Sequence, residues 1–444
     1  MMAATDYDVI VVGCGPTGLM ACGELAGRGV RVLGIDKKPR LDTNIRSASG
    51  FFFADLTFNN EYIRLEPLKD RTRLHYTNCG FAIEYSDTME GIHHSHMFSD
   101  TGKHWQATTR KKPFYNTFVP GRWLSDRYRC ALAKGAEFLC GTVALRVKQT
   151  AAHVELMVRT DGRNRTLTCR KLIASDGLSS RVARSAGVNK GRTYYGTGPT
   201  LEYEVTGVEC PYDRGDMFFF GAKNFGGRAG MLIMVPSPNG ENAFRIETMS
   251  PMPASNGTEI MEYFLRESPY AGWFKNISVL DRSGALVELL TPMKTPFLGN
   301  ILFAGDSAAW AECLYQCATM AGYMGAVCTV MELENRNGFE EYTKWWGDHF
   351  EWIKNPKRMA DYGKRVFFPR FFTVKELDFL FDLAEKNPIV VDEAEATPYD
   401  FTAVVFQQFM AMPEVPPYLK QRMQEVIDAD QARIATVIGK VQEA

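Results

Sequence analysis

The sequence predicts an α/β fold in which a parallel sheet is interleaved with a second β-sheet and followed by a helical C-terminal region. Three patterns predict this fold. Short apolar segments at residues 7–12, 171–175 and 300–304 each end at a glycine or an aspartate, as strands buried on both faces of a parallel sheet do. Residues 193–290 alternate between apolar and polar side chains, which is typical of antiparallel strands. Beyond residue 334 the pattern becomes helical and rich in aromatic residues.

The composition is that of a globular protein and excludes several function classes. The 444 residues are enough for two or three domains with a large core. Because 51 Lys and Arg nearly balance 52 Asp and Glu, the net charge of −1 provides no global field for binding nucleic acid, and we predict no nucleic-acid partner. The 10 cysteines show no disulfide framework, and we find neither a signal peptide nor a run of about 18 apolar residues. We therefore expect a cytoplasmic location.

A glycine-rich segment, GCGPTG, follows the first predicted strand directly and precedes a predicted helix. In such a strand–turn–helix unit Gly13 makes the tight turn, Gly15 lets the backbone approach a pyrophosphate, and Gly18 lets the helix pack close to the strand. The unpaired N–H groups and the partial positive charge of the helix N-terminus attract phosphate. We therefore predict that a dinucleotide binds here, in contact with Gly13, Gly15, Pro16, Thr17 and Gly18.

An acidic residue ends the next predicted strand, at residues 31–35. Asp36 lies 23 residues after Gly13, where its carboxylate can accept hydrogen bonds from both ribose hydroxyls of an adenosine. A glycine motif alone would be weak evidence, but here the strand, helix, second strand and terminal acid are all present.

Two later strand ends favour FAD over NAD. Asp176 and Gly177 follow one apolar strand, and Gly305 and Asp306 follow another. A carboxylate just beyond a parallel strand lies at the edge of the sheet where ligands bind. Asp306 can accept a hydrogen bond from a polyol hydroxyl, which the ribityl chain of a flavin has and NAD lacks. A helix predicted from residue 307 would place N–H donors near the pyrimidine carbonyl of the flavin, where they stabilise its reduced form.

With these motifs in place, the chain resembles a family of FAD-dependent oxidoreductases. The segments GCGPTG, ASDGLSSRVAR and LFAGDSAA look like those of geranylgeranyl reductases, FixC-like electron-transfer flavoproteins and aromatic hydroxylases, which share the p-hydroxybenzoate hydroxylase fold. The resemblance covers about the first 335 residues. It implies a discontinuous Rossmann-like FAD-binding domain interleaved with a β-sheet substrate domain, plus a helical C-terminal region.

The resemblance also suggests domain boundaries. The FAD-binding domain would comprise residues 1–74, 105–190 and 291–335, and the substrate domain would comprise residues 75–104 and 191–290. Residues 336–444 would form the helical C-terminal region.

Three basic residues are candidates through the same resemblance. The segment DKKP followed by NIRSASG is similar to the geranylgeranyl reductase pattern, which adds Lys37 and implies that Arg46 contacts the ribose–phosphate side of FAD. The segment GRWLSD resembles a helix start whose arginine, here Arg122, reaches the ribityl–phosphate region. Arginine suits bidentate recognition of phosphate, although surface salt bridges would explain Arg46 and Arg122 equally well on physical grounds.

The chain departs from the family after Asp306. Relatives carry a Pro-x-x-Gly-x-Gly turn against which the flavin lies, and this sequence has Cys313, Gln316 and Ala318 at those places. Cys313 and Cys317 would lie one helical turn apart near the flavin, where a thiol could donate a proton, attack a substrate or exchange with a disulfide. Alternatively, both are small buried residues that fill the space left by glycines. The candidate catalytic residues are Cys313, Gln316 and Cys317, and Ala318 is a candidate cofactor contact.

Five of the seven histidines fall between residues 75 and 104. His94 and His96 would point to the same side of a strand, which offers two metal ligands, but no Cys, His or Asp set with ligand spacing completes a site. We therefore predict no metal, and favour polar residues on a hairpin, or a general acid or base, over a metal centre. The five histidines are His75, His93, His94, His96 and His104.

Aromatic residues are concentrated in two places. Six within the antiparallel region are expected to be core residues, and the resemblance implies that part of them lines an apolar substrate pocket. In the C-terminal region, the FF and LDFLF segments would form a lid or a homodimer contact, which we favour over docking on a membrane surface. The tail from Leu419 is predicted to be one amphipathic helix. The six aromatic residues are Tyr194, Tyr195, Phe218, Phe219, Phe220 and Phe225.

The sequence therefore predicts an FAD-dependent oxidoreductase that transfers a hydride between flavin N5 and an apolar or conjugated small organic substrate, by C=C reduction or dehydrogenation. One alternative is an NAD(P)H- and O2-dependent monooxygenase, and another is an electron-transfer flavoprotein that acts with a partner protein or quinone. No second strand–GxGxxG–helix unit is present, so electrons would come from transiently docked NAD(P)H, from a redox partner protein, or from the substrate itself.

Overall fold

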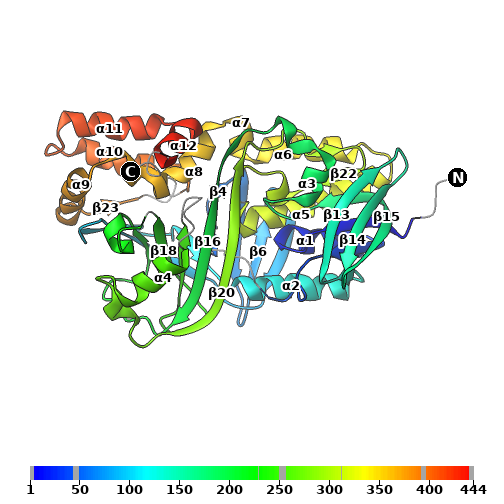
Figure 1. Cartoon of the computed structure of the whole chain (residues 1–444), viewed down its shortest axis with the longest axis horizontal. Coiled ribbons are helices and arrows are strands. Elements are labelled where there is room, and N and C mark those ends of the chain that lie inside the picture. Colours follow the sequence, from blue (N-terminus) through cyan, green and yellow to red (C-terminus); the bar gives the residue numbers. More distant parts are fainter. Residues whose placement is uncertain are drawn as a thin grey trace.

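The structure, a computed structural model, describes residues 5–43, 50–228, 230–249, 257–311, 313–391 and 397–439. It confirms the predicted α/β class with a helical C-terminal region (Figure 1). One half contains a sheet with three long helices packed against it, and the other half contains a second sheet and the C-terminal helices. Two long strands, β16 (Tyr194–Thr206) and β20 (Ser278–Leu290), run between the halves.

The first sheet holds the predicted parallel strands. Its order is β12-β2-β1-β15-β14-β13, with β22 beside β15 and β21 beside β22. Four strand pairs are parallel, and β13, β14 and the first part of β15 form an antiparallel extension. The strands are β1 (Tyr7–Val12), β2 (Val32–Ile35), β12 (Glu137–Leu139), β13 (Thr142–Gln149), β14 (Val154–Thr160), β15 (Arg163–Ala174), β21 (Phe297–Leu298) and β22 (Ile301–Phe303).

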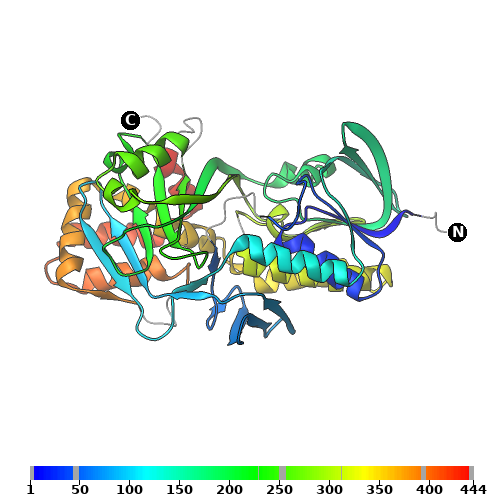
Figure 2. The same ribbon diagram turned by 90° about the horizontal axis from the view of Figure 1, so that it is seen from below.

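Three helices pack together beneath this sheet in the view of Figure 2: α1 (Pro16–Gly27), α2 (Pro120–Ala133) and α5 (Leu314–Leu333). The α1–α5 contact is close enough that the backbones touch, because a Cβ on Gly322 would lie only 2.2 Å from the carbonyl oxygen of Thr17. A short helix, α3 (Arg181–Ala186), follows β15.

The helix predicted from residue 307 begins later, so this prediction is wrong by about two turns. A single 3-10 turn at Gly305–Ser307 follows β22, and α5 starts only at Leu314. The carbonyl groups between them bond to other segments instead of continuing a helix. Those of Ala308 and Trp310 accept hydrogen bonds from the backbone N–H groups of Met293 and Leu290.

The second sheet has the order β20-β16-β19-β18-β17-β9-β10-β23. It brings together two of the segments assigned to the substrate domain, and its outermost strand comes from the C-terminal region. The domain boundaries themselves stay a prediction. The strands not yet given are β9 (His94–Phe98), β10 (His104–Thr108), β17 (Asp216–Phe219), β18 (Met231–Pro236), β19 (Phe244–Met249) and β23 (Ile389–Val390).

Two small sheets and a short helix complete this half. One sheet has the order β3-β11-β8, the other β4-β5-β6-β7, and α4 (Gly257–Arg266) packs on the second sheet. The small-sheet strands are β3 (Phe51–Phe52), β4 (Thr57–Phe58), β5 (Glu61–Pro67), β6 (Thr72–Tyr76), β7 (Phe81–Tyr85), β8 (Glu90–Ile92) and β11 (Tyr115–Thr117).

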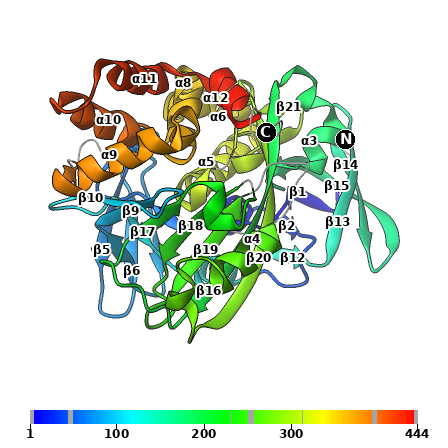
Figure 3. The same ribbon diagram turned by 60° about the vertical axis from the view of Figure 1, so that its left-hand side comes forward.

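The C-terminal region is helical, as predicted, and packs against the β10 edge of the second sheet (Figure 3). Phe381 of α9 meets Trp105 of β10 edge-to-face, with ring centroids 6.0 Å apart. The tail prediction of one helix is wrong, because the chain extends at Ala429 and divides the tail in two. The helices are α6 (Gly338–His349), α7 (Glu351–Lys354), α8 (Lys357–Phe367), α9 (Val374–Lys386), α10 (Phe401–Ala411), α11 (Pro417–Asp428) and α12 (Gln431–Gly439).

Among the helices in the described ranges, none is both long and apolar enough to cross a lipid bilayer.

Candidate functional site

A cavity of about 400 Å³ opens at the carboxyl ends of β1, β2 and β15. Ligands of open α/β sheets bind at this edge, where strand ends and helix N-termini meet. Its walls contain ten residues that the sequence nominated for cofactor binding, together with a stretch of β20 from the second sheet. The ten are Gly13, Gly15, Pro16, Thr17, Asp36, Lys37, Asp176, Gly177, Asp306 and Ala318.

The glycine loop has three glycines in three different situations. Gly13 has a φ of +91°, and a Cβ there would lie 2.4 Å from the carbonyl oxygen of Ser175. A Cβ on Gly18 would lie 1.9 Å from the carbonyl oxygen of Gly13. A Cβ on Gly15 would meet nothing within 4 Å. The first two glycines are therefore required by close packing, whereas Gly15 leaves its side of the loop bare toward the cavity.

The N-terminus of α1 has the properties of an anion site. Pro16 occupies the first turn, and no side chain of the described chain caps the helix. Lys37, Lys38 and Arg181 also line the cavity, so positive charge surrounds the bare loop. Backbone N–H groups, the helix dipole and these cations together favour a pyrophosphate.

Asp36 is held in place by the backbone around it. It is buried, and its two carboxylate oxygens accept hydrogen bonds from the N–H groups of Cys14, at 2.7 Å, and Lys38, at 2.8 Å. These contacts fix the carboxylate at the cavity wall, and each oxygen keeps a further lone pair for a ribose hydroxyl.

Asp176 has a structural task as well as a place in the cavity wall. One of its oxygens accepts from the Ser180 hydroxyl at 2.6 Å, and the other accepts from the Arg181 N–H at 2.7 Å. Burial raises the pKa of this carboxyl, and the hydrogen bonds to Ser180 and to the backbone oppose that rise. Asp176 therefore fixes the start of α3, which places Arg181 and Gly177 beside the cavity.

Asp306 lies in the cavity wall shortly before α5, and its neighbour Gly305 packs against Thr17 of the glycine loop. One of its oxygens accepts the Cys313 N–H at 2.8 Å, and this contact ties the loop between β22 and α5. Gly305 has a φ of +62°, and a Cβ there would lie 2.2 Å from the Thr17 hydroxyl. Gly305 and Gly18 thus act through backbone packing, since neither lies in the cavity wall.

The three candidate catalytic residues are buried beside the cavity, not in its wall. The Gln316 side-chain oxygen accepts the Phe53 N–H at 2.5 Å, which fastens the segment after β3 to α5. Asn59 donates its amide to the Cys317 sulfur at 3.4 Å. Cys313 precedes α5, so it does not share a helical face with Cys317. The catalytic roles stay predictions, and this geometry favours the alternative of buried packing residues.

Leu314 and Tyr315 occupy the place that the sequence assigned to these cysteines. Leu314 has a φ of +53°, a left-handed conformation that leucine rarely adopts, and both residues line the cavity with Ala318. Tyr315 packs edge-to-face on Phe118, with centroids 5.1 Å apart. No sequence signal marks Leu314 as left-handed, so sequence reasoning missed both. Other wall residues that were not predicted include Lys38, Phe51, Leu124, Thr142, Val143, Ala144, Ser175, Arg181 and Leu286. Of these, Lys38, Leu124, Ser175 and Arg181 lie inside motifs already quoted.

The structure describes one of the two arginines predicted to contact FAD. Arg122 forms an ion pair with Asp87 and does not line the cavity, which matches the surface salt bridge considered above. Arg46 lies outside the described residues.

The clustered histidines are engaged with one another and with backbone. His96 contacts the His104 ring nitrogen at 3.0 Å and donates to the Asp213 carbonyl at 2.8 Å. Burial lowers the pKa of His104 to about 4, with His96 adding to the effect, so His104 is neutral at physiological pH. Both ring nitrogens of His96 are therefore occupied, and the pair stabilises the β9–β10 hairpin.

The buried cysteines make stability depend on alkaline pH. Burial raises the pKa of the Cys317 thiol to about 12, with the Asn59 amide opposing the rise. Above about pH 9 the unfolded thiol ionises while the folded one cannot, so stability falls by up to about 1.4 kcal/mol per pH unit until pH 12. We expect Cys317→Ala to flatten the fall in Tm between pH 9 and 11, and Cys130→Ala, at an exposed site, to leave it unchanged. Equal slopes in all three proteins would contradict this assignment.

The fold and the cavity define a dinucleotide-binding flavoprotein oxidoreductase. The cavity wall combines a bare glycine loop and cations for a pyrophosphate, acids for hydroxyl groups, and apolar side chains. Residues 6–49 match the FAD binding domain family, which confirms FAD as the cofactor.

Relatives agree with this class. A digeranylgeranylglycerophospholipid reductase from Methanocaldococcus jannaschii is 23% identical over 359 residues, which are 78% of this chain and 84% of the relative. A geranylgeranyl bacteriochlorophyll reductase-like protein from Thermoplasma acidophilum has the same fold, with a TM-score of 0.65 at 17% identity over 94% of this chain and 99% of that one. A p-nitrophenol 4-monooxygenase from Pseudomonas putida shares the fold at a TM-score of 0.55 and 14% identity, over 99% and 98% of the two chains. The chain is an FAD-dependent oxidoreductase that resembles the geranylgeranyl reductases.

Proposed function

We propose that this enzyme reduces or forms a C=C bond in an apolar or conjugated organic substrate. The observation that carries the proposal is a single cavity whose wall holds both the bare Gly15 loop and four large apolar or aromatic side chains, Phe51, Leu286, Leu314 and Tyr315. Bound FAD would supply hydride transfer at N5.

The residues present fit FAD at each part of the molecule. The glycine loop and the α1 N-terminus would hold the pyrophosphate, and Asp36 would accept the adenosine ribose hydroxyls. Asp306 would accept a ribityl hydroxyl. Because α5 begins at Leu314, its first N–H groups, rather than those directly after Asp306, would face the pyrimidine carbonyl.

The apolar side chains of the cavity wall would exclude water from the reacting atoms. Leu314 and Tyr315 line the cavity beside Ala318, so their large side chains would narrow the space beside the flavin. The rigid aromatic contact of Tyr315 with Phe118 would keep this wall fixed. The wall therefore favours a slender apolar substrate, and the reductase relative named for a geranylgeranylated lipid supports an unsaturated, isoprenoid-like chain.

The electron source distinguishes this proposal from a monooxygenase, a reaction that the shared fold also supports. We propose to reduce the purified yellow protein anaerobically with NADPH, NADH and dithionite, and then to admit oxygen while following the flavin absorbance. Bleaching by dithionite only, with slow reoxidation, supports the reductase, with a redox partner protein as donor in the cell. Rapid bleaching by a nicotinamide, followed by stoichiometric oxygen consumption with substrate, contradicts it.

The bare loop gives a direct test of how FAD is held. We expect Gly15→Ala to fold normally, because its Cβ meets no protein atom, but to bind FAD more weakly. The methyl group would keep the pyrophosphate from one backbone N–H, and losing one such charged hydrogen bond weakens affinity by about 10- to 100-fold. The matched control is Gly347→Ala in α6, where a Cβ also meets nothing. Equal FAD affinity in both variants would contradict the assignment.

A further inference from the structure

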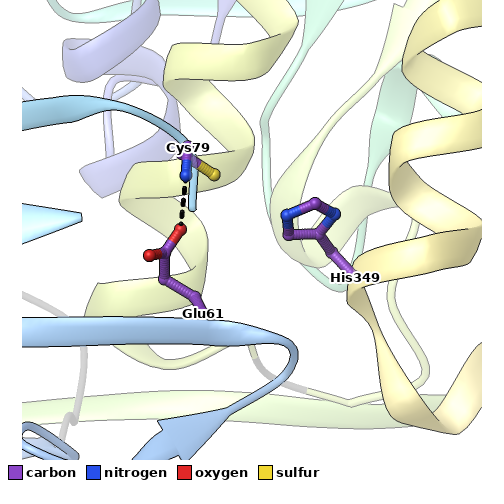
Figure 4. A group of neighbouring side chains, drawn as sticks. All are labelled: Glu61, Cys79 and His349. Atoms are coloured by element: carbon purple, nitrogen blue, oxygen red, sulfur yellow. Dashed lines mark hydrogen bonds between the residues drawn. The ribbon is translucent and has the colours of Figure 1, made fainter. Parts of the chain in front are cut away.

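Three potential metal ligands meet outside the FAD cavity. Glu61 begins β5, Cys79 lies in the turn between β6 and β7, and His349 ends α6. Figure 4 shows the His349 ring pointing across toward the other two side chains. Their ligand atoms all lie within 4.8 Å of one another. His349 lies 270 residues after Cys79, which is why no ligand spacing was visible in the sequence.

The Glu61 carboxylate is fixed and buried. Its side chain is 1% exposed, and its oxygens accept the N–H groups of Asn78 at 2.7 Å and Cys79 at 2.9 Å. These bonds shape the turn so that the Cys79 sulfur lies beside the carboxylate. Within the described part of the chain, no lysine or arginine forms an ion pair with Glu61. A buried negative charge of this kind calls for a positive partner.

His349 presents a lone pair to the same place. Its Nδ1–H donates to the Trp345 carbonyl at 3.2 Å, and the two rings contact each other at a tilt of 34° with centroids 4.9 Å apart. This hydrogen bond selects the tautomer in which Nε2 is an acceptor. Nε2 is buried and has no hydrogen-bond partner. A histidine that donates one nitrogen to a backbone carbonyl and leaves the other free is the usual arrangement of a metal ligand.

We propose that Glu61, Cys79 and His349 bind one Zn²⁺ ion, with water as the fourth ligand. A sulfur, an imidazole nitrogen and a carboxylate are the donors that Zn²⁺ takes, whereas Mg²⁺ and Ca²⁺ require oxygen ligands throughout. Zn²⁺ bonds of about 2.0 to 2.3 Å would draw the three ligand atoms closer together than they stand without the ion.

Binding balances the charge of the buried cluster. The Sγ–Zn bond forms as the Cys79 thiol proton leaves to solvent, and the resulting thiolate and the carboxylate together neutralise the two charges of the ion. Without metal, burial and the Glu61 carboxylate raise the pKa of Cys79, so the thiol stays protonated. Burial also lowers the pKa of His349 and keeps its imidazole neutral, as a ligand must be.

The site would link two parts of the chain. Glu61 and Cys79 belong to the small β4–β7 sheet, whereas His349 belongs to the helical C-terminal region. An ion held by all three would fasten that sheet to α6, and it would raise Tm because it binds only the folded protein.

The test uses the full-length flavoprotein freed of metal with a chelator and titrated with Zn²⁺ alone. We expect one equivalent to bind and to raise Tm, and Co²⁺ in its place to give a sulfur-to-cobalt charge-transfer band. Cys79→Ser and His349→Gln should each weaken binding on the order of 100-fold or more and remove the rise in Tm. Cys130→Ser and His153→Gln change the same residue types elsewhere and should bind like the unaltered protein.

The Zn²⁺ titration has outcomes that would contradict the proposed metal site. Binding of Zn²⁺ that is unchanged by both ligand substitutions, or no binding at one equivalent, would overturn the proposal. Flavin content and circular dichroism show whether each variant folds, and in the folded chain His349→Gln removes the hydrogen bond and the ring contact to Trp345. Neither result depends on the FAD reaction, so this proposal and the proposed function fail independently.

Discussion

Replacing Arg365 with methionine is expected to lower the free energy of unfolding by about 3–5 kcal/mol, the usual cost of leaving one charge of a buried ion pair unpaired. Arg365 of α8 donates to the Asp216 carboxylate of β17 at 2.7 Å and to the Ser95 hydroxyl at 2.8 Å. The Asp216 side chain is fully buried, and that of Arg365 is 12% exposed. Without the guanidinium, Asp216 would keep only the hydrogen bond from Tyr115.

Aromatic rings around the guanidinium increase the expected loss. Its central carbon lies 4.3 Å from the Phe401 ring centroid and 4.8 Å from that of Phe218. A cation between two ring faces is stabilised beyond its ion pair. Methionine would fill the space but would provide neither the charge nor the hydrogen bonds.

Chemical denaturation followed by tryptophan fluorescence measures this loss, and two variants control it. Arg28→Met breaks the more exposed i,i+4 pair with Glu24, which is worth only about 0.3–0.5 kcal/mol. The double variant Arg365→Met with Asp216→Leu removes both charges and should recover most of the stability, because an apolar pair can replace a buried ion pair. If Arg365→Met were no less stable than Arg28→Met, the pair would not hold α8 to the second sheet.

The strand ends explain why so much of the cofactor site could be predicted from the sequence. Gly13, Asp36, Asp176 and Asp306 each lie just beyond the end of an apolar strand, and parallel strands bring their carboxyl ends to one edge of a sheet. Local sequence therefore determined which residues meet. Alternation of apolar and polar residues predicted the antiparallel strands, although β17 and β18 prove to be buried on both faces.

Contacts between distant segments could not be predicted in this way. Nothing near Arg365 in the sequence points to Asp216, and the two meet only when α8 docks on β17. Helix α5 begins only at Leu314, which has a left-handed conformation, because the carbonyl groups before it accept hydrogen bonds from another segment. Tertiary contacts therefore override the helical sequence pattern there. For this reason the cysteines predicted beside the flavin are buried next to the cavity, and Leu314 and Tyr315 take their place.

Replacing Gly322 with alanine is expected to separate α1 from α5 and to weaken FAD binding. The new Cβ would lie 2.2 Å from the Thr17 carbonyl oxygen and 3.0 Å from the Met20 Cβ, so backbone must move. Overpacking of this kind costs about 1–3 kcal/mol, which exceeds the gain of about 1 kcal/mol from replacing a helical glycine. Because Thr17 also lines the cavity, the displaced helix would carry the phosphate-binding loop with it.

One turn further along α5, Gly325 provides a matched comparison. A Cβ there would lie 3.5 Å from the Leu302 side chain, an ordinary contact, so Gly325→Ala should keep the helix gain and stabilise the protein by about 0.5–1 kcal/mol. Tm and flavin content should therefore both fall in Gly322→Ala, whereas Tm should rise and flavin content stay unchanged in Gly325→Ala. Because both substitutions replace glycine by alanine in the same helix, Tm changes of opposite sign can come only from the atoms that each new methyl group contacts. Equal effects would mean that helix propensity, and not the α1–α5 contact, controls the position of the phosphate-binding loop.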